Sequence, residues 1–145
     1  MFLEIQKESK LYQEVLNLRY ELFFESTRYD QSVLHDELEP KSRHFAIVES
    51  ERLIAYGRLS FIEGGIFQIS QIVVNPSEQR KGYGSKLLSY LLEECERAGS
   101  KEVFLNARVS AVSLYSRLGF KVSGVEYLSP KTKIPHIKMV KRRGI

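Results

Sequence analysis

A short glycine-containing loop at residues 79–84, QRKGYG, has the residue types and the position needed to bind an anionic phosphate. Gly82 and Gly84 lack a Cβ atom, so the backbone can turn sharply and bring several N–H groups close to one ligand. The loop follows an apolar run at 67–74 and opens a helix predicted over 85–98. The first N–H groups of a helix are unpaired and carry about half a positive charge. The pattern predicts a pyrophosphate-binding loop.

The spacing of the glycines in the loop distinguishes between different kinds of phosphate-binding loop. A Walker A loop ends in Gly-Lys-Ser/Thr, which this segment lacks, and a dinucleotide-binding fingerprint has a third glycine where Leu87 stands. The segment instead fits the pattern Gln/Arg-x-x-Gly-x-Gly/Ala through Gln79, Gly82 and Gly84.

A second motif lies about thirty residues further on, at 111–120 (AVSLYSRLGF), and is typical of a short helix that ends at Gly-Phe. With these two motifs the chain resembles the GNAT family of acetyl-CoA-dependent N-acetyltransferases. The strand at 67–76 resembles the acetyl-CoA-pairing strand of that family. The segment 134–139 (IPHIKM) resembles the last strand of its ElaA-like branch. The resemblance covers nearly the whole chain.

The resemblance implies an α/β fold in one domain over residues 1–145. The expected sheet is mixed, mostly antiparallel and twisted, with six to seven strands and about four flanking helices. It splays open between the fourth and fifth strands, and the pantetheine arm of acetyl-CoA would enter that gap as a co-substrate, with no metal. The residues expected at the cofactor are Ile72, Val73, Val74, Gln79, Arg80, Lys81, Gly82, Tyr83, Gly84, Ser85, Asn106, Ser113 and Tyr115.

Acyl transfer to an amine needs a neutral amine, a polarised thioester carbonyl and a proton for the departing thiolate. Tyr115 matches the general-acid tyrosine of the family, and a backbone N–H near Val74 is the expected donor to the carbonyl oxygen. An amine with a pKa of about 10.4 is almost entirely protonated at pH 7, so a base or a solvent relay is required. The candidate bases are Asp36 and Glu37, in an acidic loop at 27–43, and His136 in the last strand. In the family this loop usually forms one wall of the acceptor site, so Asp30 and Glu39 could also help to attract a cationic amine.

Each candidate base also has a purely structural interpretation, as a solvated loop carboxylate or as a histidine bonded to neighbouring backbone. Arg108 stands where the family usually has an asparagine that holds the pantetheine. Asn106 could take over that contact. Arg108 could then pair with the acidic loop, reach a substrate carboxylate, or lie on the surface without a role. Cys95 falls on the apolar stripe of the 85–98 helix and is expected in the core.

The composition limits the classes of protein that fit. A chain of 145 residues, 43% of them hydrophobic, suits one domain with a core. Its net charge of +4 comes from 22 basic and 18 acidic residues that are interspersed, so neither a nucleic-acid nor a membrane partner is predicted. A single cysteine and no signal peptide lead us to expect a cytoplasmic protein. The resemblance implies that it acts on a small-molecule or peptide amine, and either a monomer or a homodimer is compatible with the sequence. The alternative is a non-catalytic acyl-CoA binding module.

The elements that must position these residues follow from hydrophobic periodicity and turn residues. Ser9 is the expected N-cap of a first helix that ends near Ser26, and a loop with one short helix fits 27–43. Gly64-Gly65 is typical of a hairpin turn. The crossover from 66–74 through the helix to 102–105 predicts a parallel pair. The predicted strands are 2–5, 44–49, 53–62, 66–74, 102–105, 120–123 and 135–141.

Overall fold

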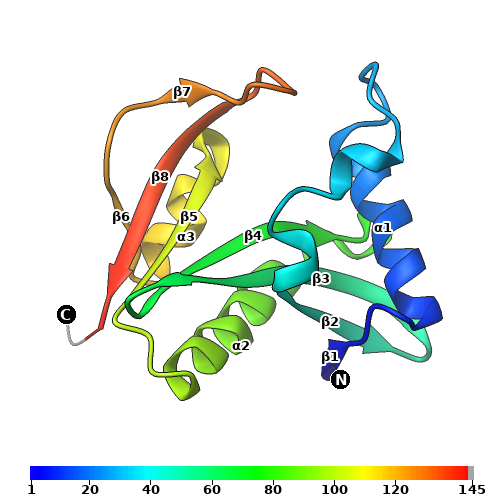
Figure 1. Ribbon diagram of the computed structural model, residues 1–145, viewed down its shortest axis with the longest axis horizontal. Helices are drawn as coiled ribbons and strands as arrows, with labels where there is room; N and C mark the ends of the chain where they lie inside the picture. Colours follow the sequence, from blue (N-terminus) through cyan, green and yellow to red (C-terminus); the bar gives the residue numbers. More distant parts are fainter. Residues whose placement is uncertain (144–145) are drawn as a thin grey trace.

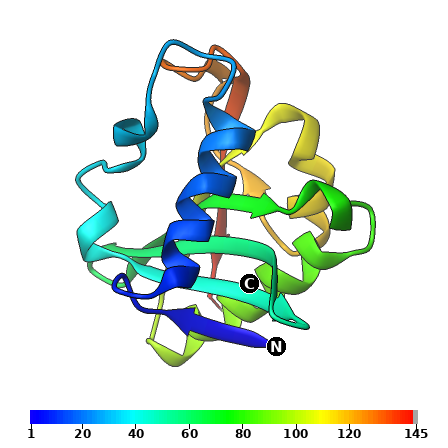
Figure 2. The same ribbon diagram turned by 90° about the vertical axis from the view of Figure 1, so that its right-hand side faces the viewer.

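The computed structural model describes residues 1–143, which form one twisted sheet with helices on both faces (Figures 1 and 2). The strands are β1 (Phe2–Ile5), β2 (Arg43–Glu49), β3 (Arg52–Glu63), β4 (Ile66–Val74), β5 (Glu102–Arg108), β6 (Lys121–Val122), β7 (Tyr127–Leu128) and β8 (Pro135–Arg142). The α-helices are α1 (Lys10–Phe23), α2 (Tyr83–Arg97) and α3 (Val112–Arg117). Short 3-10 helices are η1 (Gln31–Leu34), η2 (Glu39–Lys41), η3 (Pro76–Glu78) and η4 (Val109–Ala111).

The strand order is β1-β2-β3-β4-β5-β8-β6, with β7 paired to β8. Neighbouring strands are antiparallel except β4 and β5, which are joined by the α2 crossover and run parallel. Gly64 and Gly65 turn β3 into β4 with φ values of 58° and 82°, which other residues rarely adopt. The predicted meander and parallel pair are therefore confirmed.

The two faces of the sheet carry separate cores. On one face α1 packs its apolar stripe on the sheet, with Val15 and Leu16 buried beside Tyr56. On the other face α2 buries Leu91 and Cys95. Figure 2 shows α1 in front of the sheet with α2 and α3 behind it. A site between β4 and β5 can therefore be reached from either face.

The sheet splits where β4 and β5 part. Only residues 66–68 of β4 pair with 102–104 of β5. Beyond them a bulge begins, since Gln71 has a φ of 58° and the register against β3 shifts between Tyr56 and Arg58. Opposite the bulge, a Cβ at position 57 would lie 2.7 Å from a Leu91 methyl and 2.8 Å from an Ile72 methyl, so a larger residue there would require both side chains to move. The bulge turns the end of β4 away from β5, as the family resemblance implied.

Several boundaries differ from the sequence prediction. Over residues 1–143 the sheet has eight strands rather than six to seven, because the two-residue β7 is too short to show alternation. Three α-helices replace the expected four, since segment 27–43 forms only the 3-10 turns η1 and η2. α1 does begin after Ser9, whose hydroxyl accepts from the Tyr12 amide at 3.3 Å, but it ends at Phe23.

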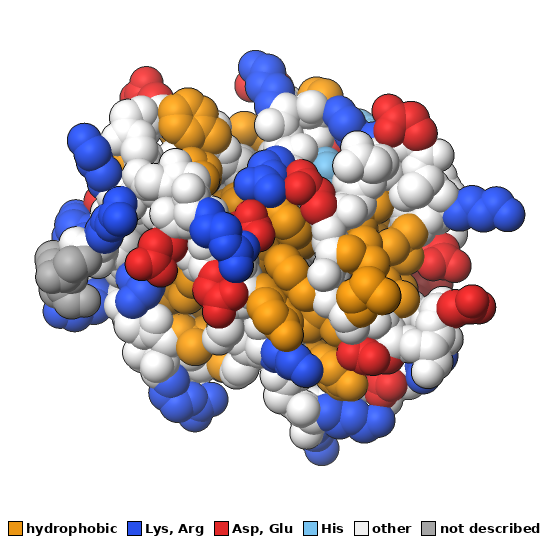
Figure 3. Space-filling model, turned by 90° about the horizontal axis from the view of Figure 1, so that it is seen from below, with side chains coloured by type: hydrophobic (Ala, Val, Ile, Leu, Met, Phe, Trp, Pro, Cys, Tyr) orange, Lys and Arg blue, Asp and Glu red, His pale blue; other side chains and the backbone are white. Residues whose placement is uncertain are grey.

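The face seen from below in Figure 3 has apolar side chains in its middle, with acidic and basic side chains around them. This matches the interspersed charge of the sequence. Among the described residues, no helix is both long enough and apolar enough to cross a bilayer.

Candidate active site

A cavity of about 620 Å³ lies at the split in the sheet. Its walls come from the end of α1, the bulged half of β4, the end of β5, the start of α3, and the segment from β7 to the start of β8. Figure 1 shows these elements on either side of the end of β4. Because α1 and α3 cover opposite faces of the sheet, the cavity passes through the split from one face to the other.

The glycine loop turns β4 into α2 next to this cavity. Of the predicted cofactor residues 79–85 only Gln79 lines it. Gly82 is the N-cap of α2, with a φ of 84° that a side chain would strain. The first hydrogen bond of the helix runs from the Lys86 amide to the Gly82 carbonyl, at 3.1 Å. The amides of Tyr83, Gly84 and Ser85 precede it and have no carbonyl partner within the helix. This start of α2 therefore offers backbone donors and a partial positive charge to an anion.

The side chains of the loop are placed less favourably for a phosphate than its backbone. Lys81 Nζ lies 2.7 Å from a Glu78 carboxylate oxygen, so its charge is already paired. Arg80 is exposed and has a φ of 67°. Gln79 Nε2 donates to the Val74 carbonyl at 3.2 Å and ties the loop to β4, where both residues line the cavity.

Tyr115 lies on α3 and lines the cavity. Its ring meets the edge of Phe120, with ring centroids 6.1 Å apart. Burial raises the pKa of the Tyr115 hydroxyl, and the positive charge of Arg108 offsets part of that rise. Asn106 also lines the cavity, whereas Ser113 is exposed and is not among the lining residues.

The other end of the cavity contains His136. Its Nδ1 lies 2.8 Å from the Ile134 carbonyl oxygen, so the proton of the neutral ring is on Nδ1 and Nε2 keeps its lone pair. Asp36 lines the cavity as well, but both of its oxygens accept from Arg58, at 2.9 and 3.1 Å. Glu37, the other candidate base, is exposed and is not among the lining residues.

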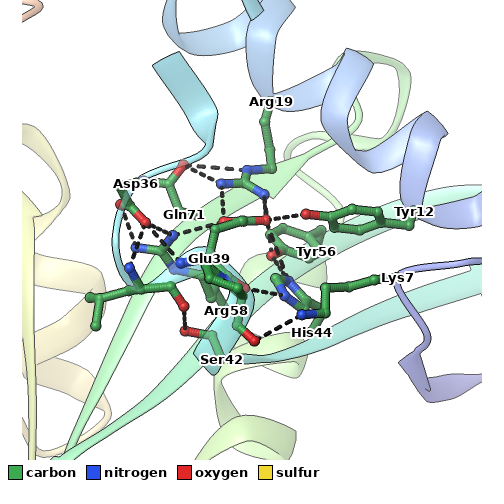
Figure 4. A network of polar contacts seen from close by, with 12 residues as sticks. Lys7, Tyr12, Arg19, Asp36, Glu39, Ser42, His44, Tyr56, Arg58 and Gln71 are labelled. Atoms are coloured by element: carbon green, nitrogen blue, oxygen red, sulfur yellow. Dashed lines mark hydrogen bonds and ion pairs between the residues drawn. The ribbon is translucent and has the colours of Figure 1, made fainter. Parts of the chain in front are cut away.

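A buried ion network that was not predicted from the sequence supports this end of the cavity (Figure 4). Both oxygens of Glu39, a residue only 2% exposed, accept from the guanidinium of Arg19, at 2.8 and 2.9 Å. Arg58 donates to the same carboxylate at 2.8 Å, and the Tyr12 hydroxyl donates to it at 2.6 Å. Glu39 was expected in the exposed acidic loop as a group that attracts an amine; it is instead enclosed.

The network extends to the bulge in β4. Arg19 Nη2 and Nε donate to the Gln71 side-chain oxygen, at 3.2 and 3.3 Å. Arg58 Nε donates to the Ser70 hydroxyl at 2.9 Å. Two arginines therefore connect η2 with the strand segment that lines the cavity. The signal in the sequence was a charged residue at the centre of each buried element, Arg19 in the α1 stripe and Arg58 in an apolar strand.

The electrostatics of the network follow from its pairing. Burial alone would raise the pKa of Glu39, but the hydrogen bonds and charge of Arg19, with help from Tyr12 and Arg58, lower it to about 2. Burial lowers the pKa of the His44 imidazole, whose Nδ1 lies 2.6 Å from the Tyr56 hydroxyl oxygen. Among the described residues, every buried side-chain nitrogen and oxygen has a hydrogen-bond partner. The network is a closed structural unit.

Cys95 lies in the core beneath α2, as the sequence predicted. Burial raises the pKa of its thiol to about 12, with a smaller contribution from the charge of Glu94. A buried thiol with so high a pKa is a poor nucleophile.

The fold and the cavity together define a class of protein. A sheet split after a bulged fourth strand, with a glycine loop at the start of the next helix, is the arrangement that the resemblance to acyl-CoA-dependent transferases implied. The chain belongs to the acetyltransferase (GNAT) family, whose model matches residues 9–120. It is therefore an acyltransferase.

Individual relatives agree with this assignment. An uncharacterized N-acetyltransferase of Bacillus subtilis, YjcF, is 28% identical over 138 residues, which cover 94% of this chain and 96% of that protein. The crystal structure of an acyl-CoA N-acyltransferase from Pseudomonas aeruginosa is 25% identical with a TM-score of 0.83, covering 97% of this chain and 98% of that one. Escherichia coli ElaA is also 25% identical, with a TM-score of 0.82 and coverage of 98% and 99%.

Proposed function

We propose that this protein is an acetyl-CoA-dependent N-acetyltransferase that moves an acetyl group directly to a primary amine of a small molecule or peptide. The observation that carries the proposal is the single cavity through the split sheet. It is lined by Val74 and Gln79 next to the glycine loop, by Tyr115 of α3 and by His136 of β8. A donor and an acceptor that enter from opposite faces can therefore meet in one space.

The donor end fits coenzyme A through its backbone. The amides at the start of α2 suit the diphosphate, and a Cβ at Gly84 would find only Val74 Cγ2, at 3.9 Å, so the approach to these amides is open. Residues 72–74 of β4 have no pairing to β5, so apart from the Val74 carbonyl, which accepts from Gln79, the backbone groups on that side are left for the amides of the pantetheine arm. The same edge supplies an N–H near Val74 for the thioester oxygen.

Tyr115 is assigned the proton that the departing thiolate takes up. In the transfer the amine nitrogen forms a bond to the acetyl carbon, the carbon–sulfur bond breaks, and the sulfur accepts the hydroxyl proton of Tyr115. Its raised pKa keeps that hydroxyl protonated at neutral pH. The transfer to sulfur is uphill in water, and the burial that raises the pKa of Tyr115 also makes it a weaker acid. The transfer therefore requires that the thiolate be desolvated as well, which raises the affinity of the sulfur for the proton.

His136 is assigned the proton that the amine loses. Its Nδ1 donates to the Ile134 carbonyl, so Nε2 is the acceptor in the neutral ring. Glu37 was an equal candidate on sequence grounds. We prefer His136 because it lines the cavity and Glu37 does not.

A thiol-release assay with acetyl-CoA and a panel of primary amines tests this function. Tyr115→Phe is expected to lower kcat by about 100-fold while acetyl-CoA affinity is kept, because general acid catalysis typically contributes 10²–10⁴-fold. Tyr90→Phe is the matched control, since Tyr90 of α2 stacks on Phe2 and does not line the cavity, so this change is expected to leave kcat unchanged.

Two outcomes would contradict the proposal. Unchanged turnover in Tyr115→Phe would remove this hydroxyl from the mechanism. Tight acetyl-CoA binding with no thiol release from any amine would favour the alternative, a non-catalytic acyl-CoA binding module.

A further inference from the structure

Arg108, the residue that departs from the family pattern, points to the chemical class of the acceptor. On the basis of the proposed function, we infer that the acceptor is an apolar amine that carries a carboxylate, and that Arg108 binds this carboxylate. The inference depends on where Arg108 lies, on which charges surround it, and on what lines the space next to it.

Arg108 lies beside the proposed base. It is the last residue of β5 and the direct antiparallel partner of His136 in β8, and His136 is in turn the partner of Tyr127 in β7. Directly opposed residues of antiparallel strands project to the same face. Arg108, His136 and Tyr127 therefore form one row across three strands, and all three line the cavity.

This row belongs to the acceptor end of the cavity. The Arg108 guanidinium carbon lies 6.0 Å from the ring centroid of Phe23, the last residue of α1. α1 covers the face of the sheet opposite to α2, whose N-terminus is the proposed diphosphate site. An anion held by Arg108 is therefore on the acceptor, and not on the phosphates of the cofactor.

The charge of Arg108 is available to a ligand, unlike that of the other arginine at the cavity. Arg58 is 3% exposed and is paired with both Asp36 and Glu39. Arg108 is exposed and forms no ion pair within residues 1–143.

The net charge of the cavity disfavours polyamines and favours amines that carry a carboxylate. Its charged lining residues are Asp36, Arg58 and Arg108, which together carry +1 with His136 neutral. A polyamine would place further positive charge next to the unpaired Arg108. A carboxylate would accept two parallel hydrogen bonds from its guanidinium, the geometry in which arginine binds carboxylates most strongly.

The remaining wall next to Arg108 is apolar. Leu22, Phe23, Phe24 and Leu38 line the cavity from the α1 side, and Tyr127 lines it from β7. Such a surface suits a hydrocarbon or aromatic group rather than a sugar with many hydroxyls. An apolar amino acid, with its carboxylate on Arg108 and its amine towards His136, meets all of these conditions.

The test compares an aromatic amine that carries a carboxylate with one that does not, and both with a polyamine. Thiol release is measured with L-phenylalanine, with L-phenylalaninamide, which has the same amine and ring without the charge, and with spermidine. We expect kcat/KM for phenylalanine to exceed that for the amide by about 10-fold or more, because a charge-assisted pair to a carboxylate is lost in the amide. Spermidine is expected to be the poorest of the three.

Arg108→Gln shows whether Arg108 causes this preference. The variant is expected to raise KM for phenylalanine by about 10-fold or more, with KM for phenylalaninamide and for acetyl-CoA unchanged. Arg117→Gln is the control, an exposed arginine of α3 that does not line the cavity, and it should leave all three values unchanged.

The outcomes separate this inference from the function on which it rests. Equal use of phenylalanine and its amide, a preference for spermidine, or an Arg108→Gln variant that keeps the preference for phenylalanine would overturn the carboxylate assignment and leave an N-acetyltransferase. Thiol release from none of the three acceptors would overturn it. Whether the proposed function falls as well is then decided by the wider amine panel.

Discussion

The two ends of the cavity differ in the groups that line them: backbone at one end and side chains at the other. The proposed donor end consists of backbone: the unpaired edge of β4 at residues 72–74 and the first amides of α2. The proposed acceptor end consists of side chains, among them Arg108, His136 and Phe23. Behind it, a buried ion network holds η2 against α1 and the bulge.

This difference explains what each end can tolerate. A backbone site accepts many side chains as long as its turns and its strand edge persist, so one ligand can be kept while the sequence changes. A side-chain site changes its ligand with a single residue, and the proposed carboxylate contact of Arg108 is such a determinant. The comparison predicts that stability, donor binding and acceptor choice can be altered separately.

The largest expected effect breaks the support of the acceptor end. Glu39→Gln leaves Arg19 without a buried counter-charge and removes one of the two partners of Arg58. Because removing one partner of a buried ion pair leaves an uncompensated charge, the free energy of unfolding should fall by about 3–5 kcal/mol. Urea denaturation measures it. Glu37→Gln, two residues away and exposed, should change it by less than about 0.5 kcal/mol; equal values for both variants would contradict the network.

A smaller effect separates donor binding from stability. Gly84→Asp adds a carboxylate to the first turn of α2, where the open space accepts a side chain. The charge should weaken acetyl-CoA binding by about 10-fold or more relative to Gly84→Asn, a neutral side chain of the same size, because it repels the diphosphate. It should also raise stability slightly relative to Asn, since a negative charge favours a helix N-terminus. Calorimetry measures the first and urea denaturation the second; equal affinities would refute the diphosphate site.

The smallest effect is the pH dependence of the network. The pKa of Glu39 is lowered from 4.5 to about 2, so the unfolded chain binds more protons than the folded one below about pH 4.5. The contribution of ionised Glu39 to the free energy of unfolding is therefore complete near pH 7 and is lost as the pH falls towards 2. Between pH 7 and pH 4 the loss is roughly 1 kcal/mol. The free energy of unfolding, measured by urea denaturation at pH 7 and pH 4 for the wild type and for Glu39→Gln, isolates the contribution of Glu39. Parallel pH dependence in the two proteins would contradict it.

The donor end could be predicted from the sequence because its signals are local. Glycines at 82 and 84 between an apolar strand and an amphipathic helix define the loop without any long-range contact, and Gly64-Gly65 defines the preceding hairpin. The core position of Cys95 followed from helical periodicity in the same way. These elements lie where predicted, with helix and strand ends shifted by a few residues.

His136 and Arg108 were candidates from the sequence, but the ion network behind them could not be predicted because its contacts join residues far apart in the chain. Arg19 and Glu39 are separated by 20 positions, and Arg19 and Gln71 by 52. A carboxylate in a polar loop usually faces solvent, so Glu39 was expected there, although two arginines enclose it. The two-residue β7 has no periodicity, and the row that it forms with His136 and Arg108 depends on strand register.

The most direct measurement is a crystal structure of the protein with coenzyme A. The central claim is that one cavity joins a backbone diphosphate site to a side-chain acceptor site. It predicts the diphosphate on the amides of residues 82–85, the pantetheine arm along residues 72–74 of β4, and the sulfur within hydrogen-bond reach of the Tyr115 hydroxyl. A diphosphate bound elsewhere, or a sulfur directed away from Tyr115, would contradict it.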